Sequence, residues 1–370
     1  MKIDTLTIEK FRALRKLKLE GLGRVNLITG RNNAGKSSVL EALRLVASKA
    51  STSVISSILR YREEDLDDSD ETARASEGGL SMIASLFLGC PSSGKIDEKI
   101  LISATGNEFS QQIVLSVGRF IQARDPDGTI RLVSQPGLFD DSDSAPALVV
   151  EINNSLPRNI TLDRFRRKGR IRVYRPEWVE EPGMPCVFIS PYGSEHSSTL
   201  GALWDKIALS DREQDVVEAL RIISPDIVAV SMIGGEGAVS RIAIARSRLF
   251  PRPVPLRSFG DGLNRIFGIV LSLVSAKGGI LLIDEIENGL HHSIQLDLWR
   301  VIFRLARQLD IQIFATSHSW DSVESFQKAS AEDEDAGVLL RLLRNGDDIV
   351  STFFSETELA IATREHIEVR

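Results

Sequence analysis

The chain has 370 residues, of which 42% are hydrophobic and 26% are charged. Such a composition supports a globular protein with a substantial core, and it excludes a long disordered chain, a collagen-like chain and a disulfide scaffold. The formal net charge of −6 means that a nucleic-acid partner needs a local basic patch, and the only cysteines, Cys90 and Cys186, fit a reducing cytosol.

The first elements predicted along the chain are a strand, a glycine loop and a helix. Residues 3–8 alternate like a strand and contain no signal-peptide stretch. Residues 25–29 form a short apolar run that ends at Gly30. From residue 36 to about residue 46, apolar side chains recur at the spacing of one helical face.

The loop between this strand and this helix matches the phosphate-binding pattern G-x-x-x-x-G-K-[ST]. It reads Gly30-Arg31-Asn32-Asn33-Ala34-Gly35-Lys36-Ser37. Glycines let successive backbone N–H groups and the helix N-terminus face phosphates. We therefore expect Lys36 to reach the β- and γ-phosphates and the Ser37 hydroxyl to bind Mg²⁺. The alternative is an ordinary strand-to-helix turn, which the strand and helix on either side disfavour.

The middle of the chain is predicted to change from an acidic segment to an antiparallel sheet. Residues 61–79 are rich in Asp and Glu and are typical of a solvated loop or helix end. Residues 99–174 show short β-like runs separated by turn residues, which favours antiparallel strands. A helical pattern returns over residues 200–207.

Capping and turn signals mark the later helices and a hairpin. Ser210 with Glu213 predicts a capping box for the helix that follows. Ser355 with Glu358 predicts the same for the final helix. That helix follows a predicted hairpin whose tight turn is Asn345-Gly346.

Two further strands are expected to deliver polar side chains to one sheet edge. Residues 279–283 form an apolar run typical of a parallel strand buried on both faces, and Asp284 and Glu285 follow it. Asp284 is expected to hold Mg²⁺ and Glu285 to polarise the attacking water. Residues 311–315 lead to His318, which is expected to contact the γ-phosphate and hold the water. The alternatives are a loop-capping carboxylate pair and a structural histidine.

With these motifs, three further segments make the chain resemble the ABC-type ATPase superfamily, in its RecF, SMC and OLD branch. The opening Ile8-Glu9-Lys10-Phe11-Arg12 is similar to the Asn-Phe-Arg opening of that branch. The segment Leu256-Arg257-Ser258-Phe259-Gly260-Asp261-Gly262 is similar to a divergent ABC signature, with Phe259 where a glycine is usual. The segment Glu287-Asn288-Gly289-Leu290-His291-His292 corresponds to the D-loop.

The resemblance implies an α/β fold of the P-loop NTPase class and ABC-ATPase type. Its core sheet would be mixed or parallel and would carry an antiparallel β-subdomain and a helical subdomain. We expect one domain over residues 1–370, in four parts. They are a phosphate-loop part (1–60), a β-rich insertion (61–198), a helical lobe (199–256) and a final part (257–370). The final part contains the signature, the strand before Asp284 and Glu285 (the Walker B strand) and the switch histidine, His318.

The resemblance also implies a homodimer, or a higher homo-oligomer, in which the signature of one subunit closes over ATP bound to the other. Ser258, Gly260 and Asp261 would contact the γ-phosphate in trans, beside a helix N-terminus that favours anions. A glycine-containing helix cap is the alternative for these residues. The residues implied to bind ATP in cis are Arg12, Gly30, Asn32, Asn33, Ala34, Gly35, Lys36, Ser37 and Ser38.

Two features narrow the choice within this branch. The segment between the phosphate loop and the signature is too short and too β-rich for the long coiled-coil arms of SMC proteins. The TOPRIM nuclease domain that follows in OLD-type nucleases is not expected before Arg370. We therefore expect a nuclease-free ATPase that works with a separately encoded, nuclease-like effector.

A basic run offers a possible DNA contact. If Lys168-Gly169 is a hairpin turn, then Arg164, Arg166, Arg170 and Arg172 share one face. Each phosphate that they neutralise should make binding more sensitive to salt. The alternatives are a solvated hairpin face and a contact with the acidic segment.

The leading hypothesis is a cytoplasmic, Mg²⁺-dependent ATPase, converting ATP and water to ADP and phosphate, whose ATP-gated dimerisation controls a DNA-directed partner in phage defence or repair. One alternative is the ATPase subunit of a membrane transporter. The other is an ATP-binding scaffold or sensor with negligible turnover. No membrane contact is expected, because the longest apolar run, residues 266–274, is far shorter than the roughly 20 residues that cross a bilayer.

Overall fold

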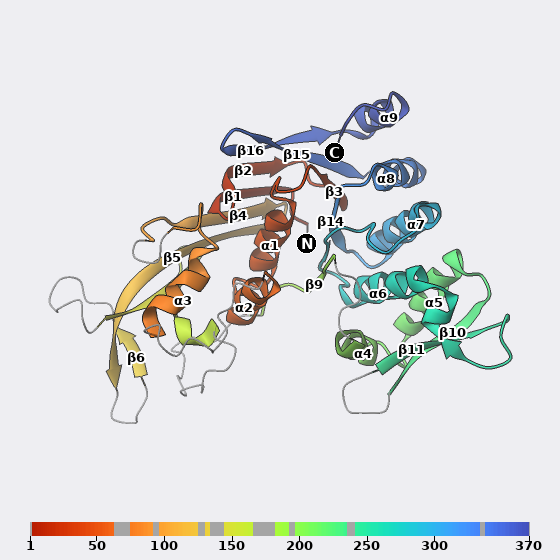
Figure 1. Ribbon diagram of the computed structural model, residues 1–370, viewed down its shortest axis with the longest axis horizontal. Helices are drawn as coiled ribbons and strands as arrows, with labels where there is room; N and C mark the ends of the chain where they lie inside the picture. Colours follow the sequence, from red (N-terminus) through yellow and green to blue (C-terminus); the bar gives the residue numbers. More distant parts are fainter. Residues whose placement is uncertain are drawn as a thin grey trace.

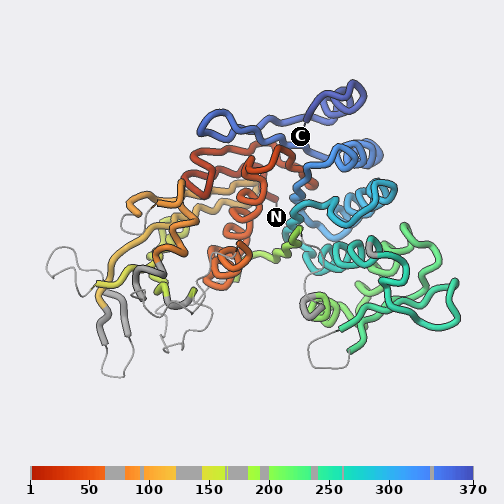
Figure 2. The backbone as a smooth tube through the Cα atoms, in the orientation of Figure 1, coloured from red at the N-terminus to blue at the C-terminus, as the bar shows by residue number. Residues whose placement is uncertain are grey.

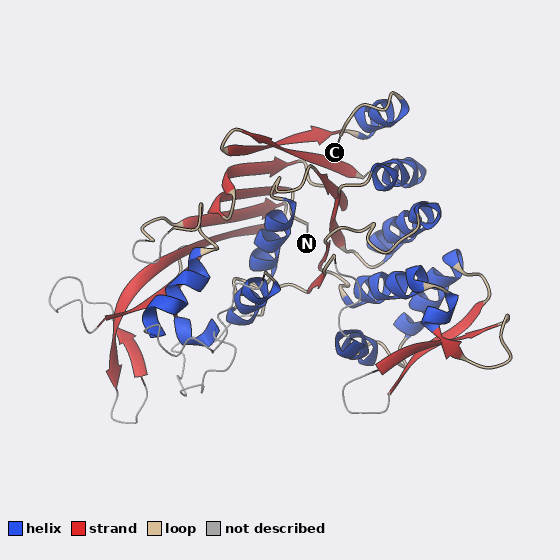
Figure 3. Cartoon of the chain, in the orientation of Figure 1, coloured by secondary structure: helices blue, strands red, loops and turns tan. Residues whose placement is uncertain are grey.

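The computed structural model describes residues 2–62, 75–91, 96–124, 130–133, 144–165, 182–191, 197–234, 241–333 and 337–369. Two large sheets and a layer of helices make up most of this structure (Figures 1 and 3). Helix α1 (Lys36–Ala47) lies between the two sheets and contacts strands of both. In the part of the chain that the structure describes, no helix combines the length and the apolar character needed to cross a membrane.

The core sheet is mixed and carries the nucleotide motifs. Its strands are β3 (Val25–Thr29), β9 (Cys186–Ile189), β13 (Ile280–Ile283), β14 (Gln312–Ser317), β15 (Val338–Asn345) and β16 (Asp348–Phe354). Their order is β16-β15-β3-β14-β13-β9, in which β16 is antiparallel to β15 and the other neighbours are parallel. Because parallel strands end at one edge, the residues after β3, β13 and β14 lie near one another.

The two faces of the core sheet pack against different layers. Ile28 and Leu282 point to the face covered by α1 and α2 (Thr52–Tyr61), whereas Leu27 and Ile283 point to the opposite face. The helices over that opposite face are α6 (Asp261–Ser275), α7 (His292–Gln308), α8 (Trp320–Glu332) and α9 (Glu356–Arg364) (Figure 1). Burial on both faces explains why β13 is apolar throughout and why β3 is mostly apolar, with Asn26 and Thr29 as its buried polar residues.

The second sheet is antiparallel, as the pattern of residues 99–174 predicted for the part that is described. Its order is β2-β1-β4-β5-β7-β8, with β6 beside β5. Its strands are β1 (Thr5–Phe11), β2 (Leu14–Glu20), β4 (Ile100–Gly106), β5 (Phe109–Arg124), β6 (Ile130–Val133), β7 (Ser144–Ile152) and β8 (Arg158–Thr161). Figure 2 shows its red N-terminal strands beside the blue C-terminal hairpin, where Ser351 Oγ donates to Lys18 O at 3.0 Å. Helix α3 (Ala75–Ala84) and the 3-10 turn η2 (Leu162–Phe165) adjoin this sheet.

The region expected as a helical lobe contains strands as well as helices. Its helices are α4 (Ser197–Asp205) and α5 (Asp211–Ile223), and its antiparallel strands are β10 (Ile227–Gly234), β11 (Arg241–Ser247) and β12 (Val254–Pro255). The inward positions of β11 are the small residues Ala243, Ala245 and Ser247. Small side chains give a weak hydrophobic alternation, which explains why these strands were not predicted.

Two local predictions need correction and one is confirmed. The hydroxyl of Ser210 accepts no capping N–H and donates to Ile207 O at 2.5 Å, and Glu213 accepts from Leu209 N. The capping box of Ser355 with Glu358 is present. The hairpin turn is centred one residue later than predicted, since the paired residues Asn345 and Asp348 enclose Gly346-Asp347.

Candidate functional site

The phosphate loop connects β3 to α1, and its backbone requires glycine at two points. Gly30 has a φ of 145°, and a Cβ there would lie 2.5 Å from the carbonyl oxygen of Leu342. Gly35 has a φ of 84° and precedes α1 without any side-chain cap. The first N–H groups of α1 are therefore left to a ligand, and a helix N-terminus favours an anion.

Lys36 is the cation of this loop, and it is held by the loop itself. Its ammonium donates to the carbonyl oxygens of Gly30 at 2.6 Å and Arg31 at 3.1 Å. Burial lowers the pKa of Lys36, while the negative charges of Asp284 and Glu285 oppose that shift. A buried cation with only carbonyl partners is well suited to bind phosphate oxygens.

The end of β13 presents two carboxylates in different surroundings. Asp284 is buried, and its Oδ1 accepts from the hydroxyl of Thr316 at 2.6 Å. Glu285 has a φ of 49°, and its Oε2 accepts from Asn288 Nδ2 at 2.6 Å. The positive φ of Glu285 is a strained conformation for a non-glycine residue, of the kind found at functional sites.

His318 follows β14 and lies beside two glutamates. Its Nδ1 is 3.8 Å from Oε1 of Glu285 and 3.2 Å from Oε1 of Glu287. The first distance fits the predicted role of His318 in keeping Glu285 in register. Glu287 was expected only as part of the D-loop, with no catalytic role, and its spacing two residues after Glu285 was the available signal.

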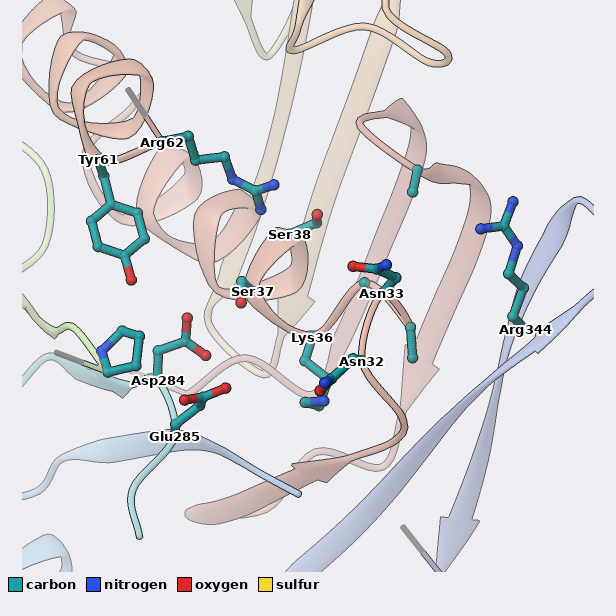
Figure 4. Close-up of a pocket in the computed structure, with 14 residues that line it drawn as sticks. Asn32, Asn33, Lys36, Ser37, Ser38, Tyr61, Arg62, Asp284, Glu285 and Arg344 are labelled. Atoms are coloured by element: carbon teal, nitrogen blue, oxygen red, sulfur yellow. The ribbon is translucent and has the colours of Figure 1, made fainter. Parts of the chain in front are cut away.

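The phosphate loop, the start of α1 and the end of β13 line a cavity of about 1040 Å³, whose lining does not include Gly30 or His318 (Figure 4). The predicted residues that line it are Asn32, Asn33, Ala34, Gly35, Lys36, Ser37, Ser38, Asp284 and Glu285. Figure 4 shows the two carboxylates facing the loop residues across this space. Three further lining residues were not predicted: Tyr61 and Arg62, from the end of α2, and Arg344, from β15. Their exposure to the cavity depends on tertiary packing, which no local pattern encodes.

The structure places Arg12 away from this lining. Its Nε donates to Oε2 of Glu41 at 3.0 Å, and its Nη1 donates to the carbonyl oxygen of Ser85. Both side chains of the Arg12–Glu41 pair are buried. The pair joins the end of β1 to α1, and the contact of Arg12 with nucleotide stays a prediction.

The signature residues lie at the start of α6 and do not line the cavity. Ser258 belongs to the 3-10 turn η3 (Leu256–Phe259), and Gly260 has a φ of 104° immediately before α6 begins at Asp261. Ser258 and Gly260 are exposed. Their contact with a nucleotide on a second copy stays a prediction.

The arginines proposed to contact DNA are mostly beyond what the structure describes. Arg164 lies in η2. Arg166, Arg170 and Arg172 lie outside the described residues, as does the Lys168-Gly169 turn. The DNA contact therefore stays a prediction.

The cavity offers hard oxygen donors that suit Mg²⁺. Ser37 and Asp284 both line it, and a hydroxyl with a carboxylate is a donor set that Mg²⁺ accepts while keeping waters and phosphate oxygens. Among the described residues, no group of three or more His, Cys, Asp or Glu side chains could enclose a metal by itself. The geometry thus fits a cation that arrives with a nucleotide.

Comparison with known proteins agrees with this geometry. The family model described as "AAA domain, putative AbiEii toxin, Type IV TA system" matches residues 25–323. An ATP/GTP phosphatase of Helicobacter pylori is 23% identical over 367 residues, which cover 96% of each chain. A Methanocaldococcus jannaschii protein without an assigned function is 52% identical over 59 residues, 16% of this chain and 27% of that one. A solved SMC head bound to the winged-helix domain of ScpA shares the fold, with a TM-score of 0.52 at 12% identity over 96% of this chain and 98% of the other.

Proposed function

From the premise that this chain belongs to the AAA-domain family whose model matches residues 25–323, we propose that it hydrolyses ATP and that ATP-gated dimerisation controls a DNA-directed partner. The family match and the shared fold identify the chain as a P-loop ATPase of the AAA and SMC-like kind. The observation that carries the proposal is the cavity in which the phosphate loop faces Asp284 and Glu285. The name of the Helicobacter pylori relative, ATP/GTP phosphatase, supports nucleotide hydrolysis.

Different residues of the site carry out different parts of the proposed hydrolysis. Lys36 exchanges its carbonyl partners for the β- and γ-phosphate oxygens, and Glu285 orients the water that attacks the γ-phosphorus. His318 holds that water and Glu285 in register. Ser37 and Asp284 would hold Mg²⁺, which neutralises charge on the phosphates when bound.

The signature supports closure by a second copy. Ser258 and Gly260 are exposed at the N-terminus of α6, away from the cavity of their own chain. A γ-phosphate bound to one copy can meet the signature of the other copy, and hydrolysis removes that contact. The nucleotide thus biases an equilibrium between open and closed dimers.

The controlled partner is proposed to be a separately encoded, nuclease-like effector acting in the cytoplasm, in phage defence or repair. The family description names a toxin of a toxin–antitoxin system, and such a system supports a function that involves a second protein. Direct DNA contact through the arginines of the 164–172 run is part of the same proposal.

The test compares Glu285→Gln with Lys36→Ala for ATP turnover and for mass in solution with and without ATP. Glu285→Gln should bind ATP, hydrolyse it at least about 100-fold more slowly and accumulate as a dimer, because binding survives while water activation is lost. Lys36→Ala should neither bind nor dimerise. Lys328→Ala, which removes an exposed ion pair with Glu324, is the control. Wild-type behaviour of both site variants would refute the proposal.

A further inference from the structure

Glu287 holds the segment that carries His318. Its Oε1 accepts the backbone N–H groups of His318 at 2.8 Å and Ser319 at 3.1 Å. The same oxygen lies 3.2 Å from Nδ1 of His318. The side chain of Glu287 is 8% exposed. A buried carboxylate therefore fixes both the backbone and the ring of the predicted switch histidine.

This contact selects the protonated nitrogen of the ring. A carboxylate beside one imidazole nitrogen stabilises a proton there, so the neutral ring carries its hydrogen on Nδ1. Nε2 of His318 then keeps its lone pair and can accept a hydrogen bond from the attacking water.

We propose that Glu287 is a positioning residue that orients His318 for hydrolysis. This inference rests on the proposed ATPase function and adds to it a residue that acts on the attacking water only through His318.

One test needs no turnover. Nitrogen-15 NMR of the histidine rings in nucleotide-free protein, with His318 assigned by loss of its signals in His318→Gln, should show the Nδ1–H tautomer predominating. Glu287→Met should shift His318 towards the Nε2–H tautomer. Glu324→Gln, an exposed glutamate on α8, is the matched control and should change nothing. A His318 spectrum unchanged by Glu287→Met would overturn the inference, even if the wild-type protein hydrolysed ATP normally.

The second test separates kcat from KM. Glu287→Met should lower kcat by about tenfold or more with KM for ATP within about twofold, whereas Glu287→Gln should recover part of the rate because an amide oxygen still accepts the two N–H groups. A proportional rise in KM without a change in kcat would contradict positioning. If the wild-type protein shows no turnover, the proposed function fails and the NMR result still decides the role of Glu287.

Discussion

The hydroxyl of Thr316 donates to Oδ1 of Asp284 at 2.6 Å. The same hydroxyl oxygen accepts the backbone N–H of Glu285 at 2.8 Å. Because β13 and β14 are parallel neighbours with Ile283 opposite Ala315, the next residue on each strand falls in place for this contact. One side chain of β14 thus sets both carboxylate-bearing residues of β13, which the proposed hydrolysis needs at fixed positions.

Removing this hydroxyl should weaken both stability and turnover. Thr316→Val leaves a buried carboxylate oxygen and a buried N–H without their partner, which should cost about 1–3 kcal/mol of unfolding free energy. Turnover should fall as well, since Glu285 loses its anchor. Denaturant unfolding and ATPase assays measure the two effects. Thr316→Ser keeps the hydroxyl and should stay close to wild type; a Ser variant as impaired as the Val variant would contradict this explanation.

The buried carboxylate of Glu41 should stabilise the fold. It pairs with Arg12 at 3.0 Å and with Arg62 at 2.7 Å, and its side chain is 2% exposed. Glu41→Gln leaves the buried guanidinium of Arg12 without its counter-charge, which should cost about 3 kcal/mol. Thermal unfolding measures the loss. Glu324→Gln breaks only an exposed ion pair and should leave the melting temperature unchanged. An equal effect in both variants would show that burial of the Glu41 pair does not matter.

The two cysteines should differ in reactivity with pH. Burial raises the pKa of Cys186 to about 11, although Arg44 opposes the shift, whereas Cys90 is exposed. At pH 8 only about a thousandth of Cys186 is then thiolate. Iodoacetamide on the folded protein should label Cys90 first, as measured by peptide mass spectrometry. Equal labelling of the two cysteines before unfolding would be inconsistent with this environment.

The raised pKa of Cys186 also makes the free energy of unfolding depend on pH. A folded-state pKa above the unfolded value means that the folded protein binds the proton more tightly. Cys186 therefore contributes stability that is fully present below the unfolded pKa and is lost as the pH rises through about 11. In Cys186→Ser, the part of the alkaline loss of stability that comes from this thiol should be absent, which unfolding at pH 9 to 11 would measure.

Local sequence patterns predicted much of the core sheet and those residues of the site that lie in continuous segments of the chain. The loop from Gly30 to Ser37 and the apolar run before Asp284 are continuous in the chain, so spacing alone identified them. Full burial of Ile280–Ile283 confirms the predicted strand. The antiparallel sheet was likewise visible in short runs separated by turn residues.

Contacts between distant segments could not be predicted in this way. Thr316 meets Asp284 only because β14 pairs with β13 in one particular register, and Glu287 meets His318 for the same reason. The contact of Arg12 with Glu41 likewise depends on how β1 lies on α1. Ser210 was predicted to cap α5, but its hydroxyl accepts no N–H there and donates to the carbonyl oxygen of Ile207.

Mixing two inactive variants tests most directly whether ATP is bound between the phosphate loop of one copy and the signature of another. Lys36→Ala keeps an intact signature and Ser258→Arg keeps an intact phosphate loop, so neither variant alone can form a complete site, whereas a mixed dimer has one. ATP turnover by each variant alone should be near background, and co-expressed, doubly tagged mixed dimers should recover up to about half of the wild-type rate, one site of two. Full activity of Ser258→Arg alone, or purified mixed dimers as inactive as their parents, would contradict the account.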